Sequence, residues 1–145
     1  MKNQRGVSLI EVMVAVIVFS VGLLGLAAMQ VNSIRFNESA SVRGHAVFLA
    51  YEMADRMRAN PAAKADPSGY AMSFGGAPGC AMSALDSCAV HARDKAEWSD
   101  ALARQLPSGE GAVIVDGNLV TITVRWDEGR VGGSQAQTVS IVTRI

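Results

Sequence analysis

The feature that most constrains this chain is an apolar run near the N-terminus with one acid at its head. From Val12 to Met29, 18 consecutive residues carry no charge, and Ser20 is the only hydroxyl among them. This length meets the requirement for a helix that spans a lipid bilayer. Glu11 comes directly before the run, and an ionised side chain at the bilayer centre costs roughly 2.5 to 3.5 kcal/mol on insertion scales. The carboxylate therefore needs a partner or a position at the membrane surface.

Charge and cysteine content bound what the rest of the chain can do. The 145 residues carry 13 basic and 13 acidic side chains, so the net charge is zero and no basic surface for nucleic acid is expected. Lys2 and Arg5 precede the run, whereas the charges after it are of mixed sign. This asymmetry predicts a cytoplasmic N-terminus and a C-terminal part outside the inner membrane, which is the periplasm in a Gram-negative cell. Cys80 and Cys88 are close enough in sequence to form a disulfide there, with two free thiols as the alternative.

A cleaved secretory signal is the alternative interpretation of the run, because the small residues of 25–30 could form a cleavage site. However, a secretory apolar region is about 7 to 15 residues long, and here the helical pattern continues past the supposed cut. The continuing apolar positions are Val31, Ile34, Val42, Ala46, Leu49, Met53 and Met57. We therefore predict one helix from Val7 to Asn60, ended by Pro61.

The residues after Asn60 predict a loop and then a second helix. The composition from Pro61 to about Ser87 is rich in Ala, Gly, Ser and Pro, so no regular structure is expected there. A helix is predicted from Ala89 to Leu106, with Asp86 or Ser87 as its cap and Trp98 as a core anchor. Its apolar stripe consists of Trp98, Ala101, Leu102, Gln105 and Leu106, and its solvated acidic face of Asp94, Glu97 and Asp100.

The last third of the chain predicts a small antiparallel sheet, because its apolar residues alternate with polar ones. We expect strands at Ala112–Asp116, Asn118–Trp126 and Gln137–Ile145, with a hairpin turn at Asp116-Gly117 and a loop at 129–134. One face of the middle strand would lie on the long helix: Val120, Ile122, Val124 and Trp126.

Catalytic and cofactor sites have little support in this sequence. A cysteine with His91 as its base lacks an obvious residue to orient the imidazole. His45 and His91 are far apart, so no zinc ligand set emerges, and neither a GxxxxGK[ST] loop nor a GxGxxG motif is present. We expect no enzyme activity and no cofactor.

The stretch from Arg5 to Glu11, RGVSLIE, resembles the type III leader of type IV pilins and type II secretion pseudopilins. The resemblance implies that a prepilin peptidase cuts between Gly6 and Val7, that Val7 is then N-methylated, and that Glu11 is the assembly glutamate. The family usually has Phe at the position of Val7. The new amine would lie one helical turn from Glu11, which could neutralise it in the same or a neighbouring subunit. The alternative is that Glu11 is only a topology marker at the membrane surface.

The implied organisation is a leader at 1–6, a transmembrane half-helix at 7–30, an extramembrane half-helix at 31–60 and a periplasmic globular domain at 61–145. The implied fold is α+β and pilin-like, with a long N-terminal helix packed on a small antiparallel sheet of about three strands. The implied location is the inner membrane, with an N-terminus in the cytoplasm, and the pilus after assembly.

A second stretch, HAVFLAYEMADRMRANP from His45 to Pro61, resembles PilV-type minor pilins. The resemblance implies a role in type IV pilus assembly, with other minor pilins, the major pilin, the inner-membrane assembly platform and membrane lipid as partners. A type II secretion pseudopilin is the nearest alternative, and a membrane-anchored enzyme or adhesin is the alternative of another class. The stretch has an apolar face of Phe48, Leu49, Met53 and Met57, and a polar face of Glu52, Asp55, Arg56 and Arg58 that is either solvated or docks a partner.

Overall fold

The computed structural model describes residues 8–129 and 136–145. It contains two compact units, Met1–Asn37 and Glu38–Ile145, and helix α1 (Leu9–Ala59) contributes to both. The second unit combines α1 and a second helix, α3 (Val90–Gln105), with a three-stranded antiparallel sheet. The predicted α+β class is therefore confirmed. The predicted leader, the Gly6–Val7 cleavage site and most of the loop predicted at 129–134 lie outside the described residues.

Helix α1 starts and stops close to the predicted positions. The carbonyl oxygen of Ser8 accepts from the backbone N–H groups of Glu11 at 3.0 Å and Val12 at 3.3 Å, which opens the first turn. At the other end Asn60 has an extended backbone, with φ −85° and ψ 113°. This conformation is expected for a residue that precedes proline, because the proline ring clashes with a helical predecessor. The helix thus ends at Ala59, one residue before the predicted end.

The segment predicted as an irregular loop contains three short helical pieces, so that expectation was wrong in part. Helix α2 (Pro61–Ala65) and the 3-10 helix η1 (Pro67–Tyr70) follow α1 directly, and η2 (Leu85–Ser87) lies further along. Asn60 and Asp66 cap the first two by accepting from the N–H groups of Ala62 and Ser68. Proline at the first helical position after an Asn or Asp cap is a recognised helix start, and both Asn60-Pro61 and Asp66-Pro67 carry it.

The predicted cap of α3 is also corrected. Neither Asp86 nor Ser87 is the cap, because both belong to η2; the cap position is Ala89, whose side chain makes no capping bond. The first turn of the helix is formed by two backbone hydrogen bonds. The carbonyl oxygen of Ala89 accepts from the N–H groups of Ala92 and Arg93 at 3.0 Å each.

The sheet has the strand order β1-β2-β3, with β1 at Glu110–Asp116, β2 at Leu119–Trp126 and β3 at Gln137–Arg144. Asp116 pairs with Leu119, so the two-residue turn is Gly117-Asn118 rather than Asp116-Gly117. Gly117 has φ +57°, a value that glycine adopts without steric cost. The segment before α3 adds one antiparallel bridge to the outer edge of β1, between Met72 and Val113.

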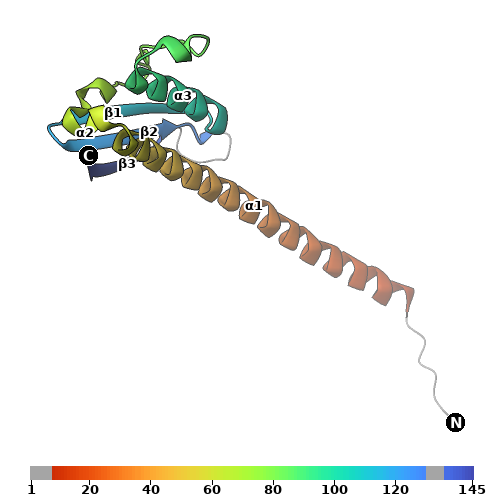
Figure 1. Cartoon of the computed structure of the whole chain (residues 1–145). Coiled ribbons are helices and arrows are strands. Elements are labelled where there is room, and N and C mark those ends of the chain that lie inside the picture. Colours follow the sequence, from red (N-terminus) through yellow and green to blue (C-terminus); the bar gives the residue numbers. More distant parts are fainter. Residues whose placement is uncertain (1–7, 130–135) are drawn as a thin grey trace. The chain divides into compact units, whose positions relative to one another are not determined.

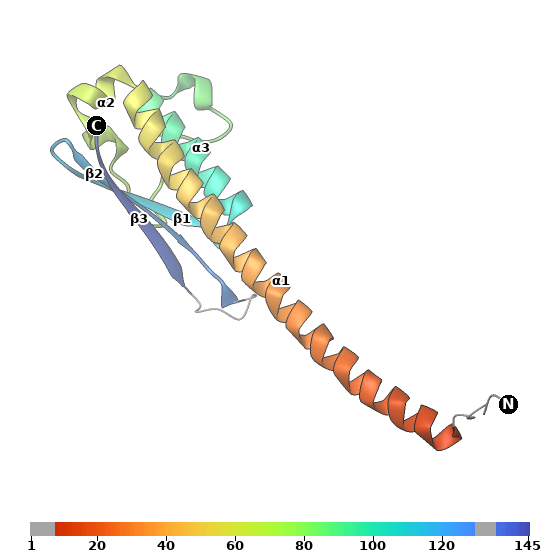
Figure 2. The same cartoon turned by 90° about the horizontal axis from the view of Figure 1, so that it is seen from below.

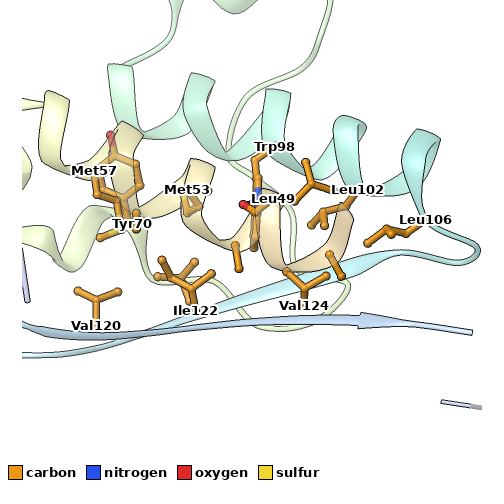
Figure 3. Packing of buried hydrophobic residues seen from close by; sticks show 14 of the residues in the cluster. Leu49, Met53, Met57, Tyr70, Trp98, Leu102, Leu106, Val120, Ile122 and Val124 are labelled. Atoms are coloured by element: carbon orange, nitrogen blue, oxygen red, sulfur yellow. Dashed lines mark hydrogen bonds between the residues drawn. The ribbon is translucent and has the colours of Figure 1, made fainter. Parts of the chain in front are cut away.

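The core lies between the helices and one face of the sheet. Figures 1 and 2 show the C-terminal part of α1 and α3 on the same side of the strands, and Figure 3 shows Leu49, Met53 and Trp98 facing Ile122 and Val124. The predicted inward face of β2 is confirmed, since the exposed fractions of Val120, Ile122, Val124 and Trp126 are 0%, 0%, 0% and 2%.

Two residues placed in the apolar stripes of the helices are not in the core. Phe48 is 64% exposed, whereas its neighbour Leu49 is fully buried. Gln105 is exposed at the end of α3, while Leu102 and Leu106 are buried. Both misplaced residues lie beside a true core position, because helical spacing defines a stripe only to within about one residue.

One glycine sets how closely the core anchor approaches the sheet. Trp98 is fully buried and donates its indole N–H to the carbonyl oxygen of Leu49 at 2.8 Å. A Cβ atom on Gly111 of β1 would lie 2.2 Å from the ring of Trp98 and 2.7 Å from Leu102. The ring therefore lies directly on the β1 backbone, which only glycine permits at this position.

Candidate functional site

The described part of the first unit is the N-terminal part of α1, whose large apolar side chains pack on no other element of that unit. The large apolar residues from Leu9 to Val31 are between 49% and 85% exposed. By length and composition, α1 is the one described helix that could cross a membrane. Exposed apolar side chains in this number are stable only when lipid or other helices cover them.

Glu11 lies in the first turn of this apolar helix. The side chains around it on the helix surface are those of Val12, Ala15, Val16 and Phe19. No ion pair among the described residues includes Glu11. A carboxylate in the first turn is favoured by the partial positive charge of the helix N-terminus. The predicted cleavage and methylation residues, Gly6 and Val7, precede the described part, so their geometry relative to Glu11 stays a prediction.

The polar face of α1 in the second unit is solvated in part, since Asp55 and Arg58 are exposed, whereas Glu52 and Arg56 belong to a hydrogen-bonded network. Arg56 donates to Glu52, one turn earlier, at 2.8 Å, and to Glu97 of α3 at 2.6 Å. Asp94 lies 3.6 Å from the same guanidinium. Partial burial lowers the pKa of Arg56, but the hydrogen bonds to Glu97 and Glu52 outweigh it and raise the pKa above its ordinary value. Arg56 therefore joins α1 to α3 through charge-assisted bonds.

Tyr70 continues this network into the buried side of η1. Its hydroxyl donates to Asp94 and accepts from the side-chain amide of Asn60, the latter at 3.0 Å. Burial raises the pKa of Tyr70 to about 12, and the hydrogen bond to Asp94 adds to this effect. The prediction of a solvated acidic face was therefore wrong for Asp94, which is 9% exposed, and for Glu97, which binds Arg56.

The two cysteines form a disulfide, Cys80–Cys88, with Cα atoms 6.1 Å apart. The bond closes an exposed loop that precedes α3. Both cysteines are therefore oxidised. Neither is a thiol that could act as a nucleophile with His91 as its base. The His91 ring instead contacts Tyr70 edge-on, with 6.1 Å between ring centroids.

A further buried carboxylate fixes the end of β2 to α1. Glu128 is 8% exposed, and its Oε1 accepts from the hydroxyl of Ser39 at 3.2 Å and from the indole N–H of Trp126 at 3.1 Å. Ser39 is near the start of the second unit, so this contact holds the sheet to the point where α1 enters it.

Sequence reasoning missed Tyr70, Asn60 and Glu128, because each makes a side-chain hydrogen bond to a residue of another element. A local signal existed only for Asn60, as the residue before a proline. His45 is exposed on α1. Within residues 8–129 and 136–145, no group of three or more His, Cys, Asp or Glu side chains is arranged to hold a metal ion.

The geometry thus defines an exposed apolar helix with an acid in its first turn, joined to a small α+β unit. A comparison with protein families matches residues 1–27 to the prokaryotic N-terminal methylation motif. Comparisons with curated proteins and with solved structures gave no significant match. The motif and the fold together support a type IV pilin-like protein, a pilin or a pseudopilin. Such a motif is typical of structural subunits rather than enzymes, and its long apolar helix fits a membrane-anchored pilin.

Proposed function

We propose that the chain is a minor pilin that takes part in assembling a type IV pilus. The observation that carries this proposal is Glu11, a single acid in the first turn of a helix whose large apolar side chains from Leu9 to Val31 are exposed. A plain membrane anchor needs no acid at this position. A subunit that must dock other helices in a fixed register has a use for one.

The proposed chemistry begins with a prepilin peptidase that removes residues 1–6 and methylates the new N-terminus at Val7. The cut creates a positive amine one helical turn from Glu11. Since an unpaired charge in lipid is costly, the carboxylate of one subunit and the amine of its own or a neighbouring subunit favour a single docking register.

The proposed topology places the N-terminus in the cytoplasm, residues 7–30 in the inner membrane, and the second half of α1 with residues 61–145 in the periplasm. The Cys80–Cys88 disulfide agrees with an oxidising compartment. The proposed partners are other minor pilins, the major pilin and the inner-membrane assembly platform. The resemblance of residues 45–61 to PilV-type minor pilins favours a pilus over a secretion system.

Mass spectrometry of the mature N-terminus tests the processing step. We expect a chain that begins with N-methylated Val7. A chain that retains Met1 would contradict the proposal and indicate a plain anchor. A chain that begins near Met29 would indicate a secreted protein.

A charge-removing variant tests the role of the acid. We expect Glu11→Gln to insert in the membrane at the normal level and to be absent from sheared fibres, because it keeps the side-chain shape but not the charge. Glu38→Gln, at an exposed position on the same helix, is the matched control and should enter fibres normally. Normal incorporation of Glu11→Gln would refute the assembly role. If neither the wild-type chain nor the control enters fibres, while deletion of the chain blocks protein secretion, the pseudopilin alternative holds.

A further inference from the structure

The outer edge of β3 presents backbone groups that are unpaired in the part of the chain that the structure describes. The N–H of Ile145 bonds to Asn118 on the β2 side, and hydrogen-bonding direction alternates along an antiparallel strand. The residues whose N–H and C=O groups point away from β2 are therefore Thr138, Ser140, Val142 and Arg144. No backbone hydrogen bond among the described residues uses these groups.

The opposite edge of the sheet, on β1, is covered in part by another segment of the chain. On β1 the outward N–H and C=O of Val113 are both bonded to Met72, at 2.7 and 3.0 Å, so the preceding segment blunts that edge. Soluble proteins protect sheet edges with such covers, or with lysines, prolines or bulges, because open edges pair with other chains. β3 contains neither Lys nor Pro, and its eight-pair register with β2 has no bulge. It is an open edge.

The apolar side chains of β3 are covered on the side of β2 but not on its outer side. On the face toward α1, Val139 and Ile141 are only partly buried, although the residues opposite them, Val124 and Ile122, are fully buried. On the other face Val142 is 61% exposed. A further strand beside β3 would cover apolar area on both faces and satisfy the free backbone groups.

We propose that β3 is a docking edge for an extended strand of a different protein subunit. The strand carries apolar or β-branched residues at alternate positions. It also carries a carboxylate beside Arg144, because Arg144 is the only charge on β3 and no ion pair among the described residues includes it. Main-chain hydrogen bonds supply the affinity, and this charge pair sets the register.

A second copy of the chain does not fit the edge. Antiparallel pairing of two β3 edges about a two-fold axis would make the two chains enter their second units from opposite directions. Copies that pack in one register in a fibre hold their second units in the same direction, a step that rests on the proposed function. Pairing β3 with the β1 edge of another copy is blocked by Met72. The strand therefore belongs to another protein.

The test uses the full chain in cells that make it naturally, with the photo-crosslinking residue benzoylphenylalanine in place of Val142. We expect an adduct with another protein that maps to an extended segment. Ser140→Pro removes one outward N–H but no ladder bond to β2, and should lower the adduct yield about tenfold. Ser140→Val keeps the N–H and should leave the yield unchanged. The same probe at Ile114, on the same face but two strands from the edge, should give no adduct.

The other outcomes overturn the proposal. These are equal yields from the Pro and Val variants while both keep the wild-type circular dichroism spectrum, an adduct between two copies of this chain, or no adduct at position 142. The abundance of the chain in sheared fibres is measured in parallel. Presence in fibres without an adduct refutes the docking edge alone, and an adduct in cells whose fibres lack the chain refutes the minor-pilin role alone.

Discussion

Tyr70→Phe tests the buried polar network between α1, η1 and α3. The substitution deletes one hydroxyl, so Asp94 loses the hydrogen bond that it accepts and the side-chain N–H of Asn60 loses its acceptor, both in a buried site. A hydrogen bond to a charged group contributes about 1.5 to 3 kcal/mol, and one between neutral groups about 0.5 to 1.5 kcal/mol. We therefore expect the free energy of unfolding to fall by about 2 to 4 kcal/mol, a large part of the about 5 to 15 kcal/mol typical of a domain.

The measurement is guanidinium unfolding of the full chain in detergent micelles, followed by tryptophan fluorescence. Both tryptophans of the chain, Trp98 and Trp126, are buried in the core of the second unit, so the signal reports on that unit. Tyr51→Phe is the matched control, because Tyr51 is 53% exposed and should change the stability by less than about 0.5 kcal/mol. Equal midpoints for the two variants would show that the network adds nothing to stability.

The same tyrosine predicts a dependence on alkaline pH. The pKa of Tyr70 is raised from 10.0 to about 12 in the folded state, so folding favours the protonated hydroxyl. Its contribution is fully present below pH 10 and is lost as the pH rises toward 12. Wild-type stability should therefore decline more steeply than that of Tyr70→Phe in this window. Parallel declines would contradict the assignment.

Two further changes test the packing and the disulfide. Gly111→Ala drives a methyl group into the Trp98 ring and should cost about 1 to 3 kcal/mol or more in unfolding free energy, whereas Gly44→Ala, in open space on α1, should stabilise by up to about 1 kcal/mol. Equal midpoints for the two variants in the micelle unfolding assay would refute this packing. Replacing Cys80 and Cys88 together with serine should cost about 2 to 3 kcal/mol, and a reductant should shift the wild-type midpoint equally; an unchanged midpoint would show that the loop does not constrain unfolding.

Much of the architecture could be predicted because it depends on local periodicity and turn chemistry. The apolar run is long enough for a helix that could cross a membrane, Pro61 marks the end of α1, and the alternation of Val120, Ile122 and Val124 marks one buried face. These features need no knowledge of distant residues, since a helix or strand repeats its side chains at a fixed period. Helix α2 and the turn η1 were also predictable, from their Asn-Pro and Asp-Pro starts, but the alanine- and glycine-rich composition suggested a loop.

The acid at the head of the apolar run was also recognisable, because Glu11 and its neighbours form a continuous motif. Only the tertiary structure decided which of the other polar residues are structural. Asp94 has the spacing of a solvated acid, yet folding places it between Tyr70 and Arg56, from two other elements.

The open edge of β3 likewise became visible only in the folded sheet. A strand sequence specifies which side chains share a face, but its neighbours are set by the order of strands in space. By itself, the sequence determined the long helix, the second helix and the three strands, their buried faces and the N-terminal methylation motif, because these follow from short-range geometry. The tertiary structure decided which charges are buried in pairs and which strand edge is left uncovered, because both depend on contacts between residues far apart in the chain.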